Sequence, residues 1–408
     1  MSSPARLHLV LCLLLLSGAG LLAKPAPAAD LEALADAIGP AEARRALAGI
    51  SARAEATGPR GEFVSEMISL ADGTARFRMA KPKGSAVEAT GLLVTSDPPD
   101  SNERNEPNDP SGPSEPNEPS GRVYLRANDD TALGPADAAM SSFVRGHEVH
   151  RMLLDLERRF RADDRAAEPG CLALRGPDAL AVTICRSAGS ELPASIELEL
   201  PAALGGGTTR IELGDWRSLH GVRLPFAADF LHAGERHTYR YSEVLPFRLA
   251  PGVVLPPGAT APDLLFARLG DLAALASAHE RTLVAHRQSD VRILLDDAAE
   301  RSIVSGRGKL LETGRGELGA RLGPYLDSID FTRYEDVVVP VVAVSADGTL
   351  GWLACQIEAA GMRRVAAGQE DVGSHSPEAI GYGFSWVELY ARDEGRWQAI
   401  GNASSPRP

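Results

Sequence analysis

The sequence predicts an α+β protein in which a curved antiparallel sheet with helices is followed by a second domain of helices and bent sheet. Many short alternating segments separated by turn residues fill the first 250 residues. A Pro/Gly-rich stretch at 249–262 then marks a domain boundary. From residue 263 the pattern becomes helical and later turns into long apolar strands. At 408 residues the chain also exceeds one ordinary core.

The N-terminus has the layout of a secretory signal. Arg6 precedes an apolar run at 7–16, and Ala26-Pro-Ala28 offers small residues for cleavage. We therefore expect a signal peptide over 1–28 and a periplasmic or secreted protein. An uncleaved anchor is the alternative, although the apolar run is short for a membrane span. No later segment approaches transmembrane length, so we expect none after signal removal.

The first domain is predicted over 31–248. Apolar spacing favours helices at 31–50 and 140–161, and Ala71-Asp-Gly73 favours a hairpin between strands at 62–70 and 74–80. The tract at 96–121 contains Pro, Glu, Asn and Ser without apolar side chains, which predicts a disordered insertion between flanking strands. Further strands are expected at 172–174, 180–185, 195–200, 208–213, 223–231 and 236–243.

Three cysteines follow the predicted signal. Cys171 and Cys185 flank two apolar runs broken by a turn at Gly176, which predicts a hairpin that brings its ends together. A disulfide and a pair of buried thiols both fit this pattern, because a cross-strand bond needs a particular register. Cys355 lies in an alternating strand and is expected to be a small core residue.

The second domain is predicted over 263–408 and begins with a helix around 275–295. His279, His286 and Asp290 lie on the same helical face as Leu283 and Leu294. His286 and Asp290 are also four residues apart, close enough to hydrogen-bond. One hypothesis makes them a catalytic acid/base pair at a pocket wall. The alternative is a locally satisfied pair, or a polar edge facing solvent or the first domain.

The remaining C-terminal segments favour a helix and a bent antiparallel sheet. A helix is expected at 310–329. Strands are expected before it at 302–306 and after it at 337–344, 350–359, 382–392 and 396–404. Alternation places Trp352 on the face opposite Cys355, and Phe384, Trp386, Glu388 and Tyr390 together on one face.

Aromatic residues supply the candidate ligand contacts. We select Tyr325, Trp352 and Trp386, for which packing in the core is the alternative. His147-Glu-Val-His150 lacks the spacing of a zinc motif, so neither a metal nor another cofactor is expected.

Residues 31–248 resemble the lipoprotein-carrier fold of LolA-type outer-membrane sorting proteins. The likeness rests on the order of elements, on Asp215-Trp-Arg217 with Gly221-Val-Arg-Leu-Pro225, and on Tyr239-Arg-Tyr241. These motifs mainly encode strand, turn and strand, so their specificity is low. The resemblance implies a half-barrel whose concave face binds acyl chains.

Residues 268–408 resemble the SnoaL-like branch of the nuclear transport factor two-like superfamily. The likeness rests on several segments together, namely 325–336, Pro340 with 344–352, 385–390, Gly395-Arg-Trp397 and 402–408. It implies a cone-shaped fold around a pocket, as in ketosteroid isomerase and scytalone dehydratase. The superfamily contains isomerases, dehydratases, cyclases and proteins without a known reaction. The carboxylate base, Tyr and protonated carboxyl of a steroid isomerase cannot all be placed in this sequence.

The sequence thus predicts an exported bacterial envelope protein that binds a small, partly apolar ligand or lipid without catalysis. One alternative is a SnoaL-like lyase or isomerase that uses His286 and Asp290. Another is a structural envelope protein that forms a homodimer through its C-terminal domain. Nucleic acid is not expected as a partner, because the net charge is −13 and the Lys and Arg residues form no dense cluster.

Overall fold

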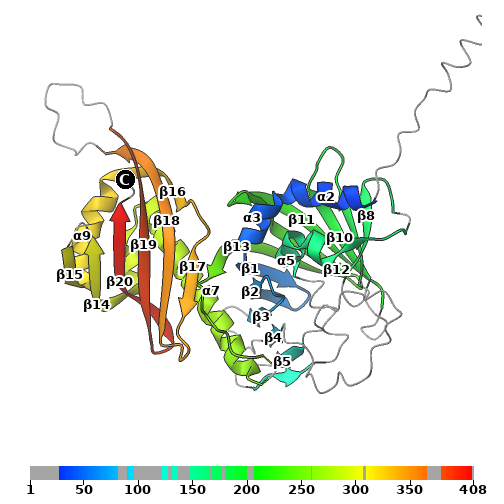
Figure 1. Ribbon diagram of the computed structural model, residues 1–408, viewed down its shortest axis with the longest axis horizontal. Coiled ribbons are helices and arrows are strands. Elements are labelled where there is room, and N and C mark those ends of the chain that lie inside the picture. Colours follow the sequence, from blue (N-terminus) through cyan, green and yellow to red (C-terminus); the bar gives the residue numbers. More distant parts are fainter. Residues whose placement is uncertain are drawn as a thin grey trace, which may run out of the picture.

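The computed structural model describes residues 27–80, 90–95, 122–126, 131–136, 148–165, 167–176, 180–199, 206–258, 260–306, 309–364 and 378–406. The described residues therefore exclude positions 1–26 of the expected signal peptide and the whole tract at 96–121. The protein is α+β and mostly sheet, as predicted. Figure 1 shows two units side by side, with a long helix between them.

The N-terminal sheet is an open ladder in which every neighbouring pair of described strands is antiparallel. In spatial order the strands are β6 (Gly134–Pro135), β5 (Val123–Arg126), β4 (Thr90–Val94), β3 (Ala75–Ala80), β2 (Gly61–Leu70), β1 (Gly49–Gly58), β13 (Glu235–Leu249), β12 (Val222–His232), β11 (Thr208–Leu219), β10 (Pro193–Glu199), β9 (Ala181–Arg186), β8 (Cys171–Arg175) and β7 (Arg161–Ala162). Because β4 pairs with β5, the tract at 96–121 connects adjacent strands of one sheet.

Four short helices among the described residues accompany this sheet, namely α2 (Pro27–Ile38), α3 (Ala41–Ala46), α5 (Val149–Leu154) and α6 (Leu156–Arg159). The predicted helix at 31–50 is wrong at its C-terminal end. Gly39 and Pro40 separate α2 from α3, and a side chain at Gly39 would meet the Gly221 carbonyl oxygen at 2.8 Å. Strand β1 then begins at Gly49. Of its inward residues only Ile50 is β-branched, and the other three are Ala52, Ala54 and Ala56, so its strand character is weak in the sequence.

Two predicted hairpins are present. Leu70 donates its N–H to the Thr74 carbonyl at the β2–β3 turn, 2.8 Å away. Strands β8 and β9 pair with Cys171 directly opposite Cys185, and the structure joins these residues in a disulfide. Of the two alternatives for this pair, the bonded one is therefore present. Cys355 is buried and free, as expected of a core residue.

The C-terminal unit places helices against a second sheet. Its strands run in the order β15 (Lys309–Gly314), β14 (Ala298–Gly306), β20 (Arg396–Pro406), β19 (Ala379–Asp393) and β18 (Leu350–Arg363), with β16 (Ile329–Asp336) and β17 (Val341–Val344) sharing the other edge of β18. The helices are α7 (Pro262–Gln288), α8 (Val291–Asp297) and α9 (Arg315–Asp327).

Several C-terminal boundaries differ from the expected ones. The single helix at 275–295 is two helices, because Ser289 adopts a left-handed conformation (φ 53°) that ends α7. The helix expected from residue 310 begins instead at Arg315, after strand β15. In the run at 337–344, only Val341–Val344 forms a strand.

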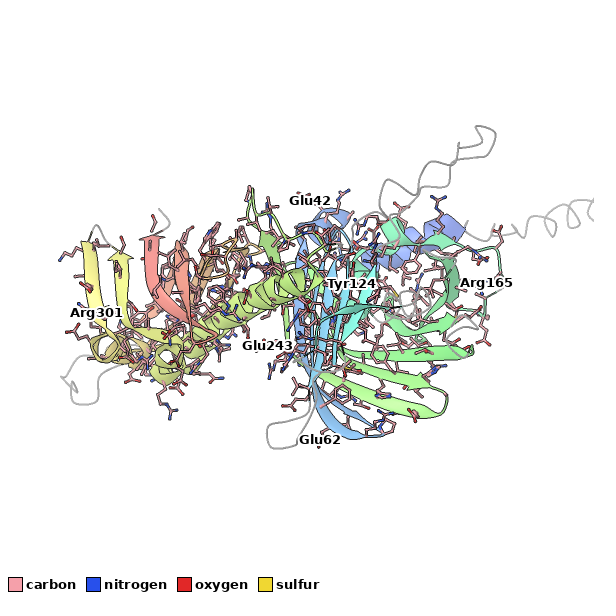
Figure 2. The ribbon with its side chains drawn as sticks, turned by 90° about the horizontal axis from the view of Figure 1, so that it is seen from below. Glu42, Glu62, Tyr124, Arg165, Glu243 and Arg301 are labelled. Atoms are coloured by element: carbon pink, nitrogen blue, oxygen red, sulfur yellow. A yellow bond between two sulfur atoms is a disulfide. The ribbon has the colours of Figure 1, made fainter. Side chains whose placement is uncertain are left out.

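The two units are joined by a strand that belongs to both sheets and by a common hydrophobic core. The end of β13 pairs in parallel with β17, so one strand belongs to both sheets. The core around α7 also continues into the N-terminal sheet, because Ile68, Leu93 and Phe247 belong to the same buried cluster as Leu269 and Leu275. Figure 2 shows α7 extending from the N-terminal sheet near Tyr124 into the C-terminal unit. The segment at 249–262 therefore connects two units that are packed together.

Candidate functional site

The C-terminal unit contains a partly open cavity of about 290 Å³ between its helices and strands β14, β19 and β20. Most of its lining is apolar or aromatic, with a few polar side chains. The lining residues are Thr282, His286, Leu294, Asp297, Ala298, Ser302, Val304, Leu318, Leu322, Tyr325, Tyr334, Phe384, Trp386, Glu388, Tyr390, Ala399, Gly401, Asn402 and Ser404. An apolar cavity with a few convergent polar groups is typical of a small-molecule site.

His286 is the polar group at the centre of the aromatic wall. It lies in the last turn of α7, and its ring stacks on Tyr334 with centroids 4.1 Å apart. Its Nδ1 lies 2.7 Å from the Thr282 carbonyl oxygen, which can only accept. Nδ1 therefore carries the proton, and Nε2 keeps its lone pair. Burial lowers the pKa of His286 to about 4, against the weaker opposing effects of Thr282 and Glu388, so the ring is neutral at pH 7.

Asp290 does not join His286. It is the N-cap of α8, where its carboxylate accepts hydrogen bonds from the backbone N–H and the guanidinium of Arg292. The expected i,i+4 pair would need a continuous helix, but α7 ends at Gln288. Asp is a strong N-cap residue, and this local preference outweighs the helical periodicity on which the prediction rested. Asp290 is also absent from the cavity lining.

Two of the three predicted aromatic contacts line the cavity. Tyr325 and Trp386 do so, and the Tyr325 hydroxyl hydrogen-bonds the Tyr382 hydroxyl at 2.7 Å. Burial, followed by this bond, raises the pKa of Tyr325, so its hydroxyl stays protonated. Trp352 is not part of the lining. It occupies the half-buried face of β18, opposite the buried Leu353 and Cys355, as the alternation predicted.

A buried polar network borders the cavity, and its partners were missed by the sequence analysis. The Nδ1 of His279 lies 3.1 Å from Glu388 Oε2, and its Nε2 lies 3.0 Å from Asp336 Oδ2. Trp386 Nε1 and the Tyr390 hydroxyl also donate to Glu388, at 3.0 and 2.7 Å. The sequence did contain a signal for this network. Glu388 lies between Trp386 and Tyr390 on an apolar strand face, and a carboxylate in that position requires buried partners.

In this network, charge pairing affects the pKa values of His279 and Glu388 more than burial does. Burial alone would lower the pKa of His279, but the charges of Glu388 and Asp336 hold it well above its ordinary value. Burial likewise tends to raise the pKa of Glu388, and His279 with the other donors brings it below its ordinary value. An imidazolium between two carboxylates therefore supports the floor of the cavity.

Replacing His286 by phenylalanine should change how stability depends on pH. The pKa of His286 is about 4 in the folded protein and 6.5 ordinarily, so protonation does not reduce the free energy of unfolding above pH 6.5. As the pH falls from 6.5 towards 4, the unfolded chain takes up a proton at this residue and the free energy of unfolding falls, by about 3 kcal/mol at most. His286→Phe should lose correspondingly less over that range in urea unfolding curves. An identical pH dependence in the variant would contradict the neutral, buried ring.

Comparisons with known proteins concern only part of the chain. No family model and no curated protein matches it. A candidate dehydratase of the NTF2-like family from Streptomyces avermitilis is 15% identical, with TM-score 0.28, over 34% of this chain and 98% of its own. A ketosteroid isomerase-like protein from Erwinia carotovora atroseptica is 15% identical, with TM-score 0.27, over 34% and 97%. An NTF2-like superfamily protein from Salmonella enterica is 10% identical, with TM-score 0.29, over 34% and 92%.

These matches amount to a low-scoring likeness to NTF2-like proteins over about a third of the chain. They transfer no activity to it. The lipoprotein-carrier resemblance of residues 31–248 stays a prediction. Among the described helices, none is both long and apolar enough to cross a bilayer.

Proposed function

We propose that the protein is an exported envelope protein whose C-terminal unit binds a small, largely apolar molecule in the cavity beside His286. The cavity itself carries this proposal. Its volume of about 290 Å³ lies at the small end of ligand pockets, which typically measure ~300–1,000 Å³. A ligand of one or two rings suits that size.

The wall chemistry narrows the ligand class. Tyr334, Phe384 and Trp386 offer flat aromatic surfaces, which favour a planar ring system. Nε2 of His286 is an acceptor in an apolar surrounding, where an unmatched polar atom is costly. A ligand hydroxyl would satisfy it. We therefore infer a neutral, planar, hydroxylated ring compound.

Export is supported by two observations. The apolar run at 7–16 has the form of a signal, and the Cys171–Cys185 disulfide is the kind of bond that persists in oxidising compartments. We further propose that the N-terminal unit is a half-barrel that binds lipid or a protein partner, on the basis of its lipoprotein-carrier resemblance and its long antiparallel ladder.

Calorimetric titration with 2-naphthol tests the binding proposal. The wild-type protein should bind this probe, and Leu322→Trp, which fills the cavity, should weaken binding at least about tenfold, equivalent to ~1.4 kcal/mol. Leu389→Trp is the matched control, because Leu389 is exposed on β19 and does not line the cavity. Equal affinity in wild type and Leu322→Trp would contradict binding in the cavity. Absence of binding to 2-naphthol and related hydroxylated rings would contradict the ligand class.

A proton-transfer enzyme is the second candidate, because His286 presents an unprotonated Nε2 and its side chain lines the cavity. A neutral imidazole can accept a proton from a carbon next to a carbonyl, but the pKa of about 4 makes His286 a weak base, so a modest acceleration is expected. The wild-type protein should then accelerate deuterium exchange at the α-carbon of 2-tetralone, and His286→Gln should abolish the acceleration while retaining 2-tetralone binding. Exchange at the uncatalysed rate in the wild type would exclude this candidate for that ketone and leave the binding function.

A further inference from the structure

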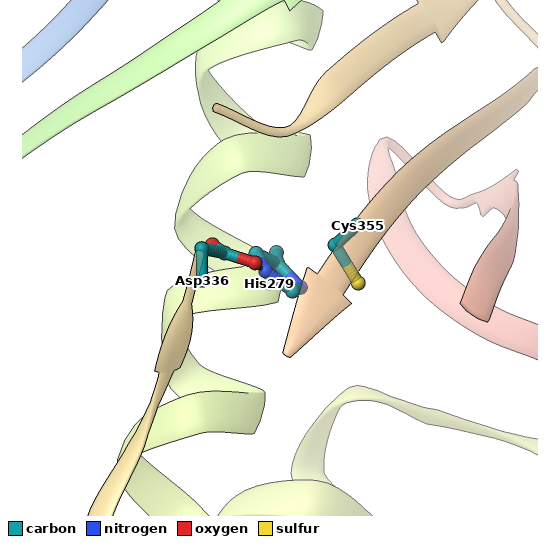
Figure 3. A group of neighbouring side chains, drawn as sticks. All are labelled: His279, Asp336 and Cys355. Atoms are coloured by element: carbon teal, nitrogen blue, oxygen red, sulfur yellow. Dashed lines mark hydrogen bonds and ion pairs between the residues drawn. The ribbon is translucent and has the colours of Figure 1, made fainter. Parts of the chain in front are cut away.

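Three side chains with metal-binding atoms lie close together between α7 and strands β16 and β18, outside the cavity lining. One nitrogen of His279, one oxygen of Asp336 and the sulfur of Cys355 all lie within 4.8 Å of one another. Figure 3 shows the His279 ring between the other two side chains. None of the three lines the cavity, whereas Glu388 and Trp386 line it and also contact the cluster.

Local structure brings these residues together. Asp336 follows the buried Tyr334 by two positions on β16, which directs its side chain towards the same face. Cys355 shares one face of the neighbouring strand β18 with the buried Leu353 and Ile357, and Asp336 pairs with Ile357. His279 is 2% exposed and projects from α7 onto this face. The cluster is thus built by regular elements rather than by loops.

A second observation concerns one buried carboxylate oxygen. Asp336 is about nine-tenths buried, and its Oδ1 has no hydrogen-bond partner among the described residues. Buried oxygens of this kind usually have a partner, and a metal ion is one of the partners that can bind them. Cys355 adds a thiol that donates to the Trp386 carbonyl oxygen, 3.9 Å away.

We propose that His279, Asp336 and Cys355 bind a zinc ion. Imidazole nitrogen, carboxylate oxygen and thiolate sulfur are the three ligand types that zinc prefers, with bonds of ~2.0–2.3 Å. A tetrahedral zinc ion holds its ligand atoms roughly 3–4 Å apart, so a pair of atoms at the 4.8 Å limit of this cluster would close by about 1 Å on binding. A water molecule completes the coordination.

The surroundings suit this ion. Glu388 accepts the Nδ1–H of His279, which leaves Nε2 as the ligand atom and reproduces the carboxylate–histidine–metal arrangement. Zinc would replace the Nε2 proton of His279 and the thiol proton of Cys355, releasing two protons. The cluster of His279, Asp336, Glu388 and Cys355 then carries one net negative charge with or without zinc, so binding adds no net buried charge.

Cobalt(II) spectroscopy on the full chain tests the proposal. Because the cluster is buried, cobalt is loaded during refolding from urea with the disulfide intact. One cobalt ion per chain and a near-ultraviolet thiolate-to-cobalt charge-transfer band are expected, since Cys355 is the free cysteine among the described residues. Zinc should displace the cobalt and bleach the band. A refolded wild type without this band overturns the proposal.

Four variants complete the experiment. Cys355→Ser should remove the band, and Glu388→Gln, which alters the residue behind His279, should weaken zinc binding roughly 10–100-fold. Glu335→Gln is the matched control on β16, because this exposed carboxylate pairs with Arg333 and should leave the affinity unchanged. Native mass spectrometry reports the zinc stoichiometry in each case. Zinc binding that survives Cys355→Ser and Asp336→Asn unchanged would show an adventitious surface site and overturn the proposal.

Discussion

Replacing Glu388 by leucine is expected to lower the free energy of unfolding by about 3–5 kcal/mol, the usual cost of breaking a buried charge pair from one side. Glu388 is 5% exposed and accepts hydrogen bonds from His279, Trp386 and Tyr390. Leucine has nearly the same volume but no acceptor, so three buried donors lose their partner. Urea unfolding with a metal chelator present measures this cost without any contribution from a bound ion.

Glu335→Gln is again the matched control for Glu388→Leu. Its carboxylate is exposed and pairs with Arg333 at the surface, so the expected change is within about 0.5 kcal/mol. Glu388→Gln should fall between the two, because its amide oxygen still accepts hydrogen bonds while its charge is gone. A Glu388→Leu variant as stable as the wild type would show that the network does not hold the cavity floor.

Replacing Phe266 by alanine is expected to destabilise both units together, by about 3–5 kcal/mol. Phe266 is 3% exposed near the start of α7 and packs against the N-terminal sheet. The guanidinium groups of Arg76 and Arg126 lie over its ring, 4.5 and 4.2 Å from the centroid. Its loss opens a cavity between α7 and strands β3 to β5.

Urea unfolding followed by both circular dichroism and tryptophan fluorescence tests this expectation. The wild type should unfold in one transition, and Phe266→Ala should shift its midpoint without changing the slope. Leu264→Ala is the control on the same helix, since Leu264 is 45% exposed and its removal should cost little. Two separate transitions, of which the variant shifts only one, would contradict a shared core.

Much of the fold follows from local patterns. The hairpin at Ala71-Asp-Gly73, the strands from residue 172 to 243 and the shared inner face of Phe384, Trp386 and Tyr390 match the predicted alternation. Strand β1 was missed because alanine favours helices, and only its pairing with β2 and β13 makes it a strand. Sequence spacing carries no signal for such long-range pairing.

The candidate site was only partly predictable. His286, Tyr325 and Trp386 line the cavity, and the sequence could single them out because polar and aromatic side chains on apolar faces stand out. Asp290 was misplaced because a left-handed Ser289 cannot be read from helical periodicity. The partners of His279 come from β16 and β19, separated from it by 57 and 109 residues, so no local spacing could reveal them.

The imidazole nitrogen chemical shifts of His286, measured by NMR with and without 2-naphthol, test the central claim most directly. The free protein at pH 7 should show a neutral ring with its proton on Nδ1, because Thr282 accepts that proton. Adding 2-naphthol should shift Nε2 strongly, as the ligand hydroxyl donates to it, and leave Nδ1 nearly unchanged. A proton on Nε2, or an Nε2 signal that does not respond to bound ligand, would contradict a binding site beside His286.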